Sequence, residues 1–249
     1  MQVGFIGSGN MAAALARGWG EPVLCSDSGS GRARALAAEL GGEAATNREV
    51  AEHADVVVLA HKPAQLADIA GEIAGTAKAV VSILGGKSQT DLRAVYPDTP
   101  VFWLEPNIPA EVGRGVLAFA EPDAPVDEAL YDAIRERFAR LGVVVEVPER
   151  LMRIAGACMG VAPAYWALLV EAWVDAAVRH GMPPATAQEL VIGGMAGTAE
   201  LLRHREGDTL AVRRAVTSPG GSTARGLDAL ERGGVRAALS RAMDEVAGD

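Results

Sequence analysis

The feature that most restricts the fold of this chain is a glycine-rich segment close to its start. Residues 2–6 form a short apolar run, residues 7–12 read G-S-G-N-M-A, and residues 13–19 have the composition of a helix. In this pattern Gly7 permits a tight strand-to-helix turn and Gly9 lets the backbone approach a pyrophosphate. The small Ala12 allows the helix to pack closely on the strand. The spacing therefore predicts a dinucleotide site within a βαβ unit.

Strand-like and helix-like segments alternate through the first half of the chain. Further apolar strands are expected at residues 23–26, 56–60, 79–83 and 101–104, and helices between them at 32–40 and 64–73. Such β-α-β alternation favours a parallel sheet with helices on both faces, which binds its ligand across the carboxyl ends of the strands. We therefore expect an α/β fold that begins with a Rossmann-type dinucleotide-binding domain at residues 1–147.

The residue that would select between NAD and NADP can be read in two ways. Asp27 ends the second expected strand, twenty residues after Gly7. A carboxylate there would bind the ribose 2′-hydroxyl of NAD and repel the 2′-phosphate of NADP. Asp27 could equally be a turn residue that opens the loop before the next helix. In that case the phosphate could be cradled by the side chains that follow, Ser28, Ser30, Arg32 and Arg34.

From residue 126 onward the periodicity is helical, apart from a strand-like run at 143–147. Apolar-rich helical segments are expected at 151–159, 163–180, 184–202 and 236–246. The segment 163–180 is apolar on nearly every face, so that one face should be buried against another subunit. We therefore expect an all-helical dimerisation and substrate domain at residues 148–249, and a homodimer or higher homo-oligomer.

Composition and charge exclude several classes of partner. The net charge is −9, and nucleic-acid binding depends on basic patches, so we expect no nucleic-acid partner. No apolar run of 18 residues and no signal peptide are apparent, which predicts a cytoplasmic protein with no membrane partner. Cys25 and Cys158 have no metal-ligand spacing, so no metal is expected. Both lie in apolar runs and should be buried free thiols.

A second motif occurs near the other end of the chain. Residues 216–231 read V-T-S-P-G-G-S-T-A-R-G-L-D-A-L-E, a Pro-Gly-Gly turn that leads directly into an amphipathic helical stretch. Gly220 and Gly221 can adopt positive φ, so the chain can turn sharply there. We expect Ser222 and Thr223 to supply N-capping hydroxyls beside the free N–H groups at the positive end of the helix. Such a corner can hold a small carboxylate and leave one hydroxyl free for a second atom of the same ligand.

Together these motifs resemble the pyrroline-5-carboxylate reductase family, whose members reduce a cyclic imino acid to proline. The resemblance covers essentially the whole chain: the glycine-rich opening, A-x-K-P at 60–63, P-A-Y-x-x-x-x-x-E-A at 163–172, and V-T-S-P-G-G-S-T at 216–223. It implies an oxidoreductase that reduces 1-pyrroline-5-carboxylate to L-proline with NADP, or NAD, as its cofactor. It also implies a homo-oligomer and a small cyclic imino acid as the substrate.

The resemblance implies a set of site residues as well. The cofactor would contact Gly7, Ser8, Gly9, Asn10, Met11, Asp27, Ser28, Asn47, Ala60, His61, Lys62, Pro63, Gly85 and Gly86. The substrate would contact Gly220, Gly221, Ser222, Thr223, Asn107 and Glu149, with the Thr223 hydroxyl bonded to the ring nitrogen as the catalytic group. His61 stands where the family has an aliphatic residue, so we expect it at the edge of the site without a titrating role.

The chain departs from the family pattern around the expected substrate pocket. The family's S-G-S-G-P-A-Y becomes M-G-V-A-P-A-Y at 159–165, which removes two hydroxyls. Its R-x-M-P-N-T-P becomes W-L-E-P-N-I-P at 103–109, so that Trp103 and Glu105 replace an Arg and a Met. Glu105 would stabilise an iminium cation if it faced the pocket, and would do nothing at a solvent-facing strand end. The departures leave two alternatives open, a different cyclic imine and a catalytically silent dinucleotide-binding paralogue.

Overall fold

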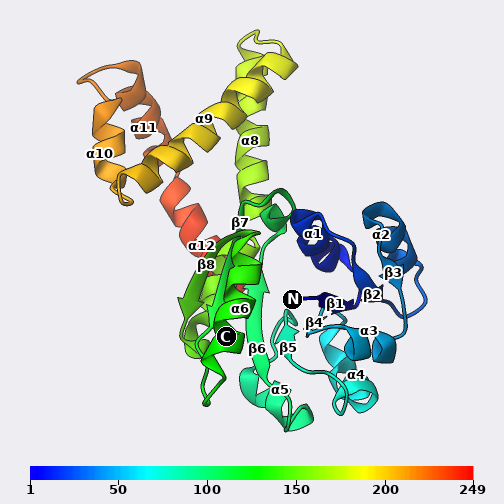
Figure 1. Ribbon diagram of the computed structural model, residues 1–249. Helices are drawn as coiled ribbons and strands as arrows, with labels where there is room; N and C mark the ends of the chain where they lie inside the picture. The colour runs from blue at the N-terminus through cyan, green and yellow to red at the C-terminus, as the bar shows by residue number, and fades with distance from the viewer. Residues whose placement is uncertain (249) are drawn as a thin grey trace. The chain divides into compact units, whose positions relative to one another are not determined.

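The chain forms two compact units. The computed structural model describes residues 1–248; its first unit is Met1–Pro163 and its second begins at Ala164 (Figure 1). The units therefore divide sixteen residues after the 147/148 boundary that the periodicity suggested. The reason is that the short helical turns after residue 148 pack beneath the sheet, where Met152 and Met159 are buried in its core.

An eight-stranded sheet with the order β3-β2-β1-β4-β5-β6-β7-β8 forms the centre of the first unit (Figure 1). Its strands are β1 (Val3–Ile6), β2 (Leu24–Ser26), β3 (Glu43–Ala44), β4 (Val56–Leu59), β5 (Val80–Ser82), β6 (Val101–Pro106), β7 (Gly115–Ala120) and β8 (Gly142–Val147). Strand β1 pairs in parallel with both β2 and β4, so the direction of winding reverses between β1 and β4. Ligands bind outside the carboxyl ends of the strands at such a switch point. The expected Rossmann-type domain is confirmed.

One strand pair departs from the parallel arrangement. Strand β7 runs antiparallel to β6, with Leu104 opposite Phe119, and β8 then pairs in parallel with β7. The connection from β6 to β7 is the 3-10 turn η2 (Ile108–Val112), which ends at Gly113 with φ of 67°. A connection this short can join only antiparallel neighbours, because a parallel crossover needs a dozen residues or more. The sheet is therefore mostly parallel.

Helices cover both faces of the sheet. One face carries α1 (Asn10–Trp19), α2 (Arg32–Leu40) and α6 (Glu128–Ala139). The other carries α3 (Asn47–His53), α4 (Leu66–Ile73) and α5 (Gln89–Val95), together with the short α7 (Met152–Ala155) and the π-helical turn η4 (Gly156–Gly160). Because successive strand residues point to opposite faces, Phe5 is buried under the first set and Ile6 under the second.

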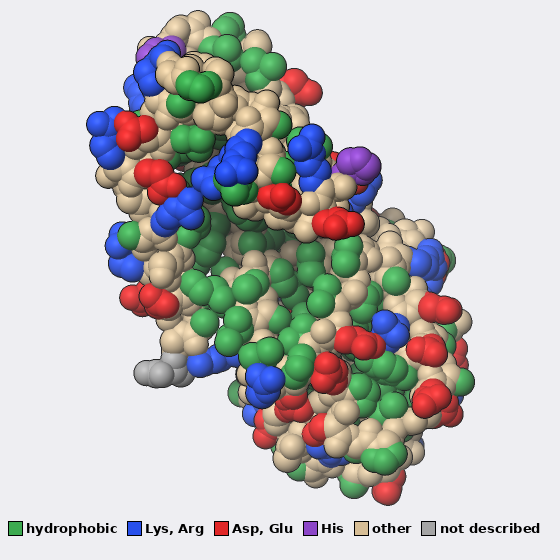
Figure 2. Space-filling view, turned by 90° about the vertical axis from the view of Figure 1, so that its left-hand side faces the viewer, with side chains coloured by type: hydrophobic (Ala, Val, Ile, Leu, Met, Phe, Trp, Pro, Cys, Tyr) green, Lys and Arg blue, Asp and Glu red, His purple; other side chains and the backbone are tan. Residues whose placement is uncertain are grey.

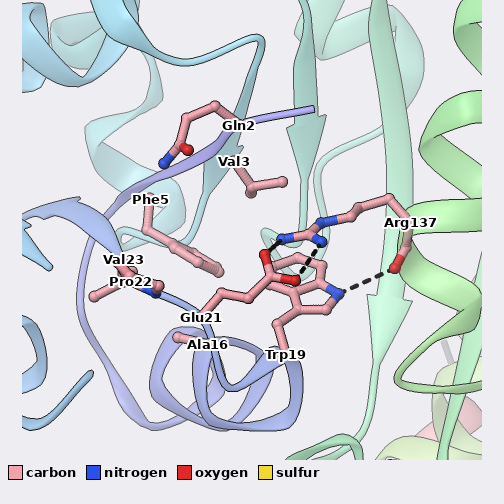
Figure 3. A pocket seen from close by; sticks show the side chains of 9 residues that line it. All are labelled: Gln2, Val3, Phe5, Ala16, Trp19, Glu21, Pro22, Val23 and Arg137. Carbon is pink, nitrogen blue, oxygen red and sulfur yellow. Dashed lines mark hydrogen bonds and ion pairs between the residues drawn. The ribbon is translucent and has the colours of Figure 1, made fainter. Parts of the chain in front are cut away.

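At the amino ends of β1 and β2, α1 is held by an aromatic and charged cluster (Figure 3). The Trp19 ring lies 5.2 Å from that of Phe138, between ring centroids, and its Nε1 donates to the Arg137 carbonyl at 3.0 Å. The Arg137 guanidinium lies over the Trp19 ring and donates to the Glu21 carboxylate. Arg137 and Arg140 lower the pKa of Glu21 to about 2. The cavity here is about 20 Å³, room for one water, so the cluster serves packing.

The second unit is helical, as expected. It contains most of α8 (Ala162–Arg179), followed by α9 (Pro184–His204), α10 (Thr209–Ala215), α11 (Ser222–Arg232) and α12 (Val235–Ala247). Helices α8 and α9 are separated by a turn at Gly181, whose φ is 89°. Among the described residues of this unit, only Ala187 and Val212 are buried hydrophobic residues, so the unit has almost no core of its own. A unit of this size needs more apolar burial than its own residues provide.

Helix α8 exposes large apolar side chains, and hydrophobic residues are visible at the surface of the molecule in Figure 2. Trp166, Leu169 and Trp173 are 52%, 37% and 67% exposed, and their i, i+3, i+7 spacing puts them on one face. The continuous helical segment Glu149–Arg179 contains an 18-residue window with a mean hydropathy of 1.4, and by length and composition alone it could cross a membrane. This does not contradict the sequence expectation, since the chain has no uninterrupted apolar run of 18 residues. Cys25 is buried as expected, whereas Cys158 is exposed.

Candidate active site

The glycine-rich turn is held between two neighbouring strands. Gly7 has φ of 99°, and a Cβ built on it would lie 2.5 Å from the carbonyl carbon of Ala60. The Gly7 N–H donates to the Ser26 carbonyl at 3.1 Å, and the Ser8 hydroxyl donates to the same oxygen at 2.9 Å. A side chain at position 7 would meet both a strained backbone and fixed atoms, so this turn requires glycine.

The next glycine opens onto free space. Gly9 is the N-cap of α1, no side chain caps the helix, and an added Cβ would have no atom within 4 Å. The N–H groups of Asn10 and Met11 therefore point out of the first turn of a ten-residue helix, where the helix dipole favours an anion. A cavity of about 410 Å³ beside this turn is lined by Ser8, Gly9, Asn10 and Arg32. This uncapped, unobstructed turn fits a dinucleotide pyrophosphate.

Asp27 organises its own loop. Its Oδ1 accepts from the Gly29 N–H at 2.8 Å, and its Oδ2 accepts from the Ser30 hydroxyl at 2.9 Å and the Ala33 N–H at 2.8 Å. The backbone N–H of Ala33 is the main reason that the pKa of Asp27 is lowered. The sequence left two roles open for Asp27, a ribose ligand and a turn residue of the loop before α2. These hydrogen bonds are those of the turn residue.

Two guanidinium groups flank the same loop. Within the described part of the chain, neither Arg32 nor Arg34 forms an ion pair. Arg32 lines the cavity beside Gly9, and Arg34 lines a second cavity of about 280 Å³ together with Asp27. Ser28 is exposed in the loop that precedes both arginines. Unpaired arginines beside serine hydroxyls suit a phosphate, since arginine binds phosphate with two parallel hydrogen bonds.

Two more expected cofactor segments lie at the carboxyl ends of β4 and β5. Ala60 donates from its N–H to the Ile6 carbonyl, which brings residues 60–63 beside the glycine-rich turn. Lys62 is exposed, and Pro63 begins the 3-10 turn η1 (Pro63–Gln65). After β5, Gly85 and Gly86 would have no atom within 4 Å of an added Cβ. The structure therefore brings these loops together along one edge of the sheet.

Three other expected site residues, Asn47, Asn107 and Glu149, form hydrogen bonds to other parts of the chain. Asn47 accepts from the Ser26 hydroxyl at 2.6 Å and donates to Glu72 at 2.8 Å. The buried Asn107 accepts from the Val116 N–H at 2.8 Å and donates to the Met159 carbonyl at 3.0 Å. Glu149 accepts from the backbone and side-chain amides of a single residue, Gln89, at 3.2 and 2.9 Å. Any contact of these three with a ligand would use their remaining hydrogen-bonding capacity.

The two residues that depart from the family on β6 differ in their surroundings. Trp103 is 7% exposed and belongs to the hydrophobic core, so it fills space under the sheet rather than lining an open pocket. Glu105 is half-buried rather than solvent-facing, and burial raises the pKa of its carboxyl. A Cβ built on Gly156 would lie only 2.2 Å from the Glu105 Oε2 atom. Gly156 of the π-helical turn thus makes room for the carboxylate.

The turn V-T-S-P-G-G-S-T before α11 differs from expectation in one respect. The N-cap is Gly221, with φ of −70° and ψ of 173° and no side-chain cap, and Gly220 before it has φ of 68°. Ser222 and Thr223 are the first two helical residues, so the expectation that their hydroxyls cap the helix was wrong. In the described residues neither hydroxyl has a hydrogen-bond partner. The N–H groups of this eleven-residue helix and both hydroxyls are therefore free to meet a ligand.

Comparison with known proteins identifies the family. Residues 149–248 match the model for pyrroline-5-carboxylate reductase dimerisation, and residues 2–86 match that for NADP oxidoreductase, coenzyme F420-dependent. A pyrroline-5-carboxylate reductase of Synechocystis sp. is 39% identical over 199 residues, covering 79% of this chain and 74% of that protein. The chain belongs to the pyrroline-5-carboxylate reductase family. The pyrroline-5-carboxylate reductase of Thermus thermophilus is 35% identical, covering 98% of this chain and 95% of that protein.

The likeness to this family extends to the fold. The pyrroline carboxylate reductase of Plasmodium falciparum, solved with NADP bound, has a TM-score of 0.87 at 26% identity and covers 99% of this chain and 95% of that one. The resemblance to this family that was read from the sequence is thereby confirmed, as is the fold class that it implied. The matched dimerisation segment begins at residue 149, close to the boundary expected from periodicity, although the compact units divide later.

Proposed function

We propose that this chain reduces 1-pyrroline-5-carboxylate to L-proline with NADPH. The observation that carries the proposal is the start of α11, where V-T-S-P-G-G-S-T ends in an uncapped helix with two free hydroxyls. Membership of the family supplies the reaction, and the open turn at Gly9 supplies a place for the cofactor's pyrophosphate. The reaction is the addition of a hydride and a proton across a C=N bond.

On the cofactor side, the bound dinucleotide supplies a hydride from C4 of its reduced nicotinamide. The chain's own residues bind and orient it. The helix N-terminus at Gly9 and Asn10 holds the pyrophosphate, while Ser28, Arg32 and Arg34 take the 2′-phosphate of NADP. Because Asp27 uses both its oxygens within the loop, it does not compete for the ribose 2′-hydroxyl as it would in an NAD-specific site.

On the substrate side, the carboxylate of the cyclic imino acid binds the N–H groups around Gly221 and Ser222, where the positive end of α11 favours an anion. The Thr223 hydroxyl then bonds the ring nitrogen. A C=N carbon accepts hydride best when its nitrogen is protonated, so Thr223 holds the iminium in place and the proton remains on the nitrogen of the amine product. This arrangement needs no carboxylic acid to deliver a proton.

The assembly belongs to the same proposal. The exposed face of α8 with Trp166, Leu169 and Trp173 is buried against a second copy of the chain, which explains why so apolar a helix is not covered within one chain. We propose that the segment Glu149–Arg179 serves this interface and does not cross a membrane. The enzyme is cytoplasmic and has no nucleic-acid partner, in keeping with its net charge of −9.

The test is to follow the loss of NADPH absorbance, and separately of NADH absorbance, with 1-pyrroline-5-carboxylate and the purified chain. Oxidation that is faster with NADPH is the expected result. Thr223→Ala should lower turnover by roughly tenfold to a thousandfold, because one oriented hydrogen-bond donor is lost, while Thr223→Ser should retain most of it. A Thr223→Ala variant within twofold of the parent would remove Thr223 from the mechanism.

A second candidate keeps the chemistry and changes the substrate. Met159 and Val161 stand where the family has two serines, and neither has a hydroxyl. A pocket without these donors would discriminate less against a different ring, such as a six-membered imino acid. Competition between five- and six-membered substrates separates the candidates. Tight NADPH binding with no turnover on any imine would indicate a silent paralogue instead.

A further inference from the structure

His61 has a fixed tautomer. Its ring Nδ1 lies 2.9 Å from the backbone carbonyl oxygen of Lys62. A carbonyl oxygen can only accept a hydrogen bond, so Nδ1 must carry the hydrogen. In a neutral imidazole the other nitrogen is then an acceptor with a lone pair. Burial lowers the pKa of His61, which keeps the ring in this neutral form at pH 7.

That second nitrogen, Nε2, is a buried atom without a partner among the described residues. A buried acceptor that has lost its water and gained no donor costs free energy, and native proteins rarely leave one. The described residues around His61 offer this nitrogen no donor, so the folded chain itself does not use it. His61 adjoins the glycine-rich turn, so its unpaired acceptor points to a donor on the ligand bound there.

The position of His61 indicates which part of a dinucleotide faces it. An added Cβ on Gly7 would lie 2.6 Å from the His61 backbone nitrogen, so His61 adjoins the glycine-rich turn. It follows β4, on the opposite side of the β1/β4 switch point from the Asp27 loop after β2. A dinucleotide crosses that point, so its adenosine half lies over β2 and its nicotinamide half over β4 and β5.

The two halves of the cofactor offer different hydrogen-bonding groups near this point. Ionised phosphate oxygens only accept, so the pyrophosphate cannot satisfy an imidazole lone pair. The nicotinamide riboside carries donors, namely its ribose hydroxyls and its carboxamide NH₂ group. We propose that His61 Nε2 accepts a hydrogen bond from the nicotinamide riboside half of the cofactor, through a ribose hydroxyl or the carboxamide.

This bond forms as residues 60–63 adjust around the cofactor, since Nε2 is covered by neighbouring atoms in the structure. Changes of side-chain rotamer at a binding site are common when a partner binds. The inference rests on the NADP-binding part of the proposed function and not on imine reduction. It gives this chain a cofactor contact that an aliphatic side chain at the same position could not make.

The experiment compares His61→Val with the parent chain by two measurements that should move in opposite directions. The Kd for NADPH, from the nucleotide's fluorescence without any imine present, should rise roughly tenfold because the bound state loses a hydrogen bond. The melting temperature of the chain without cofactor should rise by a few degrees, because the unpaired acceptor is gone. His61→Gln, which can present an oxygen acceptor, should restore part of the affinity.

A direct readout comes from ¹⁵N NMR of the imidazole nitrogens. The His61 Nε2 resonance should move from that of a free acceptor to that of a hydrogen-bonded one when NADP⁺ saturates the protein. His180→Gln, at an exposed histidine, is the matched control and should change neither Kd nor melting temperature. Equal NADPH affinity in His61→Val and the parent, with an unmoved Nε2 resonance, would overturn the inference while leaving cofactor binding intact. If the parent chain binds no NADPH, the cofactor assignment itself fails.

Discussion

Alanine substitution of the two glycines in the opening turn should affect different properties, stability at Gly7 and ligand binding at Gly9, because the surroundings of the two residues differ. Gly7 has φ of 99° and would bring a Cβ within 2.5–2.6 Å of the Ala60 and His61 backbone. Gly9 has φ of −77° and ψ of −177°, which any residue adopts, and its Cβ would enter open space. Gly7→Ala should therefore damage folding, whereas Gly9→Ala should damage only the binding of a ligand that needs that space.

The magnitudes follow from these geometries. At Gly7 a non-glycine backbone with positive φ costs about 1–3 kcal/mol. The overlap with strand backbone, which cannot rotate away as a side chain could, adds a similar amount, so Gly7→Ala should lose roughly 2–5 kcal/mol. For a chain of this length that corresponds to a fall in Tm of about 5–15 °C. Gly9→Ala should stay within about 1 kcal/mol of the parent, because the weaker N-cap is offset by a less flexible unfolded chain.

The assays are urea unfolding for stability and fluorescence titration for the NADPH Kd. Gly9→Ala should raise that Kd at least tenfold, because its methyl group occupies the closest approach to the pyrophosphate. Gly71→Ala, on α4 with no atom within 4 Å of the new Cβ, is the control and should gain roughly 0.5–1 kcal/mol with unchanged Kd. Unaltered stability in Gly7→Ala, or unaltered Kd in Gly9→Ala, would refute the reasoning for that glycine.

Three further perturbations test other parts of the structure. Glu21→Gln should lose about 1 kcal/mol at pH 7, since the carboxylate is 42% exposed and solvent screens its ion pairs. The pKa of Glu21 is lowered to about 2, so this difference should be present above pH 4.5 and vanish as the pH of urea unfolding falls towards 2. Gly156→Ala should cost less than about 1 kcal/mol in the parent, because the Glu105 carboxylate can move aside, and nothing in a Glu105→Ala background; equal costs in a double-mutant cycle would show that the two residues are independent. Trp173→Glu should convert the oligomer to monomers in light scattering, and an unchanged mass would place the interface elsewhere.

Local pattern predicts much of the sheet but misses two strands, β3 and β7. The strands β1, β4 and β5 are continuous apolar runs, which is what burial on both faces requires, and each was expected within one or two residues. Strand β3 has only the two exposed residues Glu43 and Ala44, too short for any periodicity. Strand β7 was not expected, and its antiparallel direction depends on the short η2 turn and on Asn107, whose contacts are made far along the chain.

The site is predictable where it depends on backbone shape and not where it depends on side-chain direction. The need for glycine at Gly7 follows from the motif, and the structure confirms it. Sequence cannot say whether the Asp27 carboxylate turns towards a ribose or into its loop, because both conformations suit the same residue. Likewise Ser222 and Thr223 are favoured N-caps, but the extended Gly221 takes that position and moves both hydroxyls into the first turn. The assignment of individual residues to cofactor and substrate stays a prediction.

The cluster around Trp19 affects whether the cofactor-binding segment of this chain, residues 2–86, could be exchanged between proteins. The segment that matches the NADP oxidoreductase model ends at residue 86, yet α1 within it is anchored by Arg137 and Phe138 of α6. If a segment ending at residue 86 were moved into another protein, one face of the Trp19 indole would be exposed to solvent and Glu21 would lose its arginine partners. Recombination, in the laboratory or in evolution, should therefore succeed only at crossover points beyond α6, where the helix that presents the pyrophosphate site travels together with its anchor.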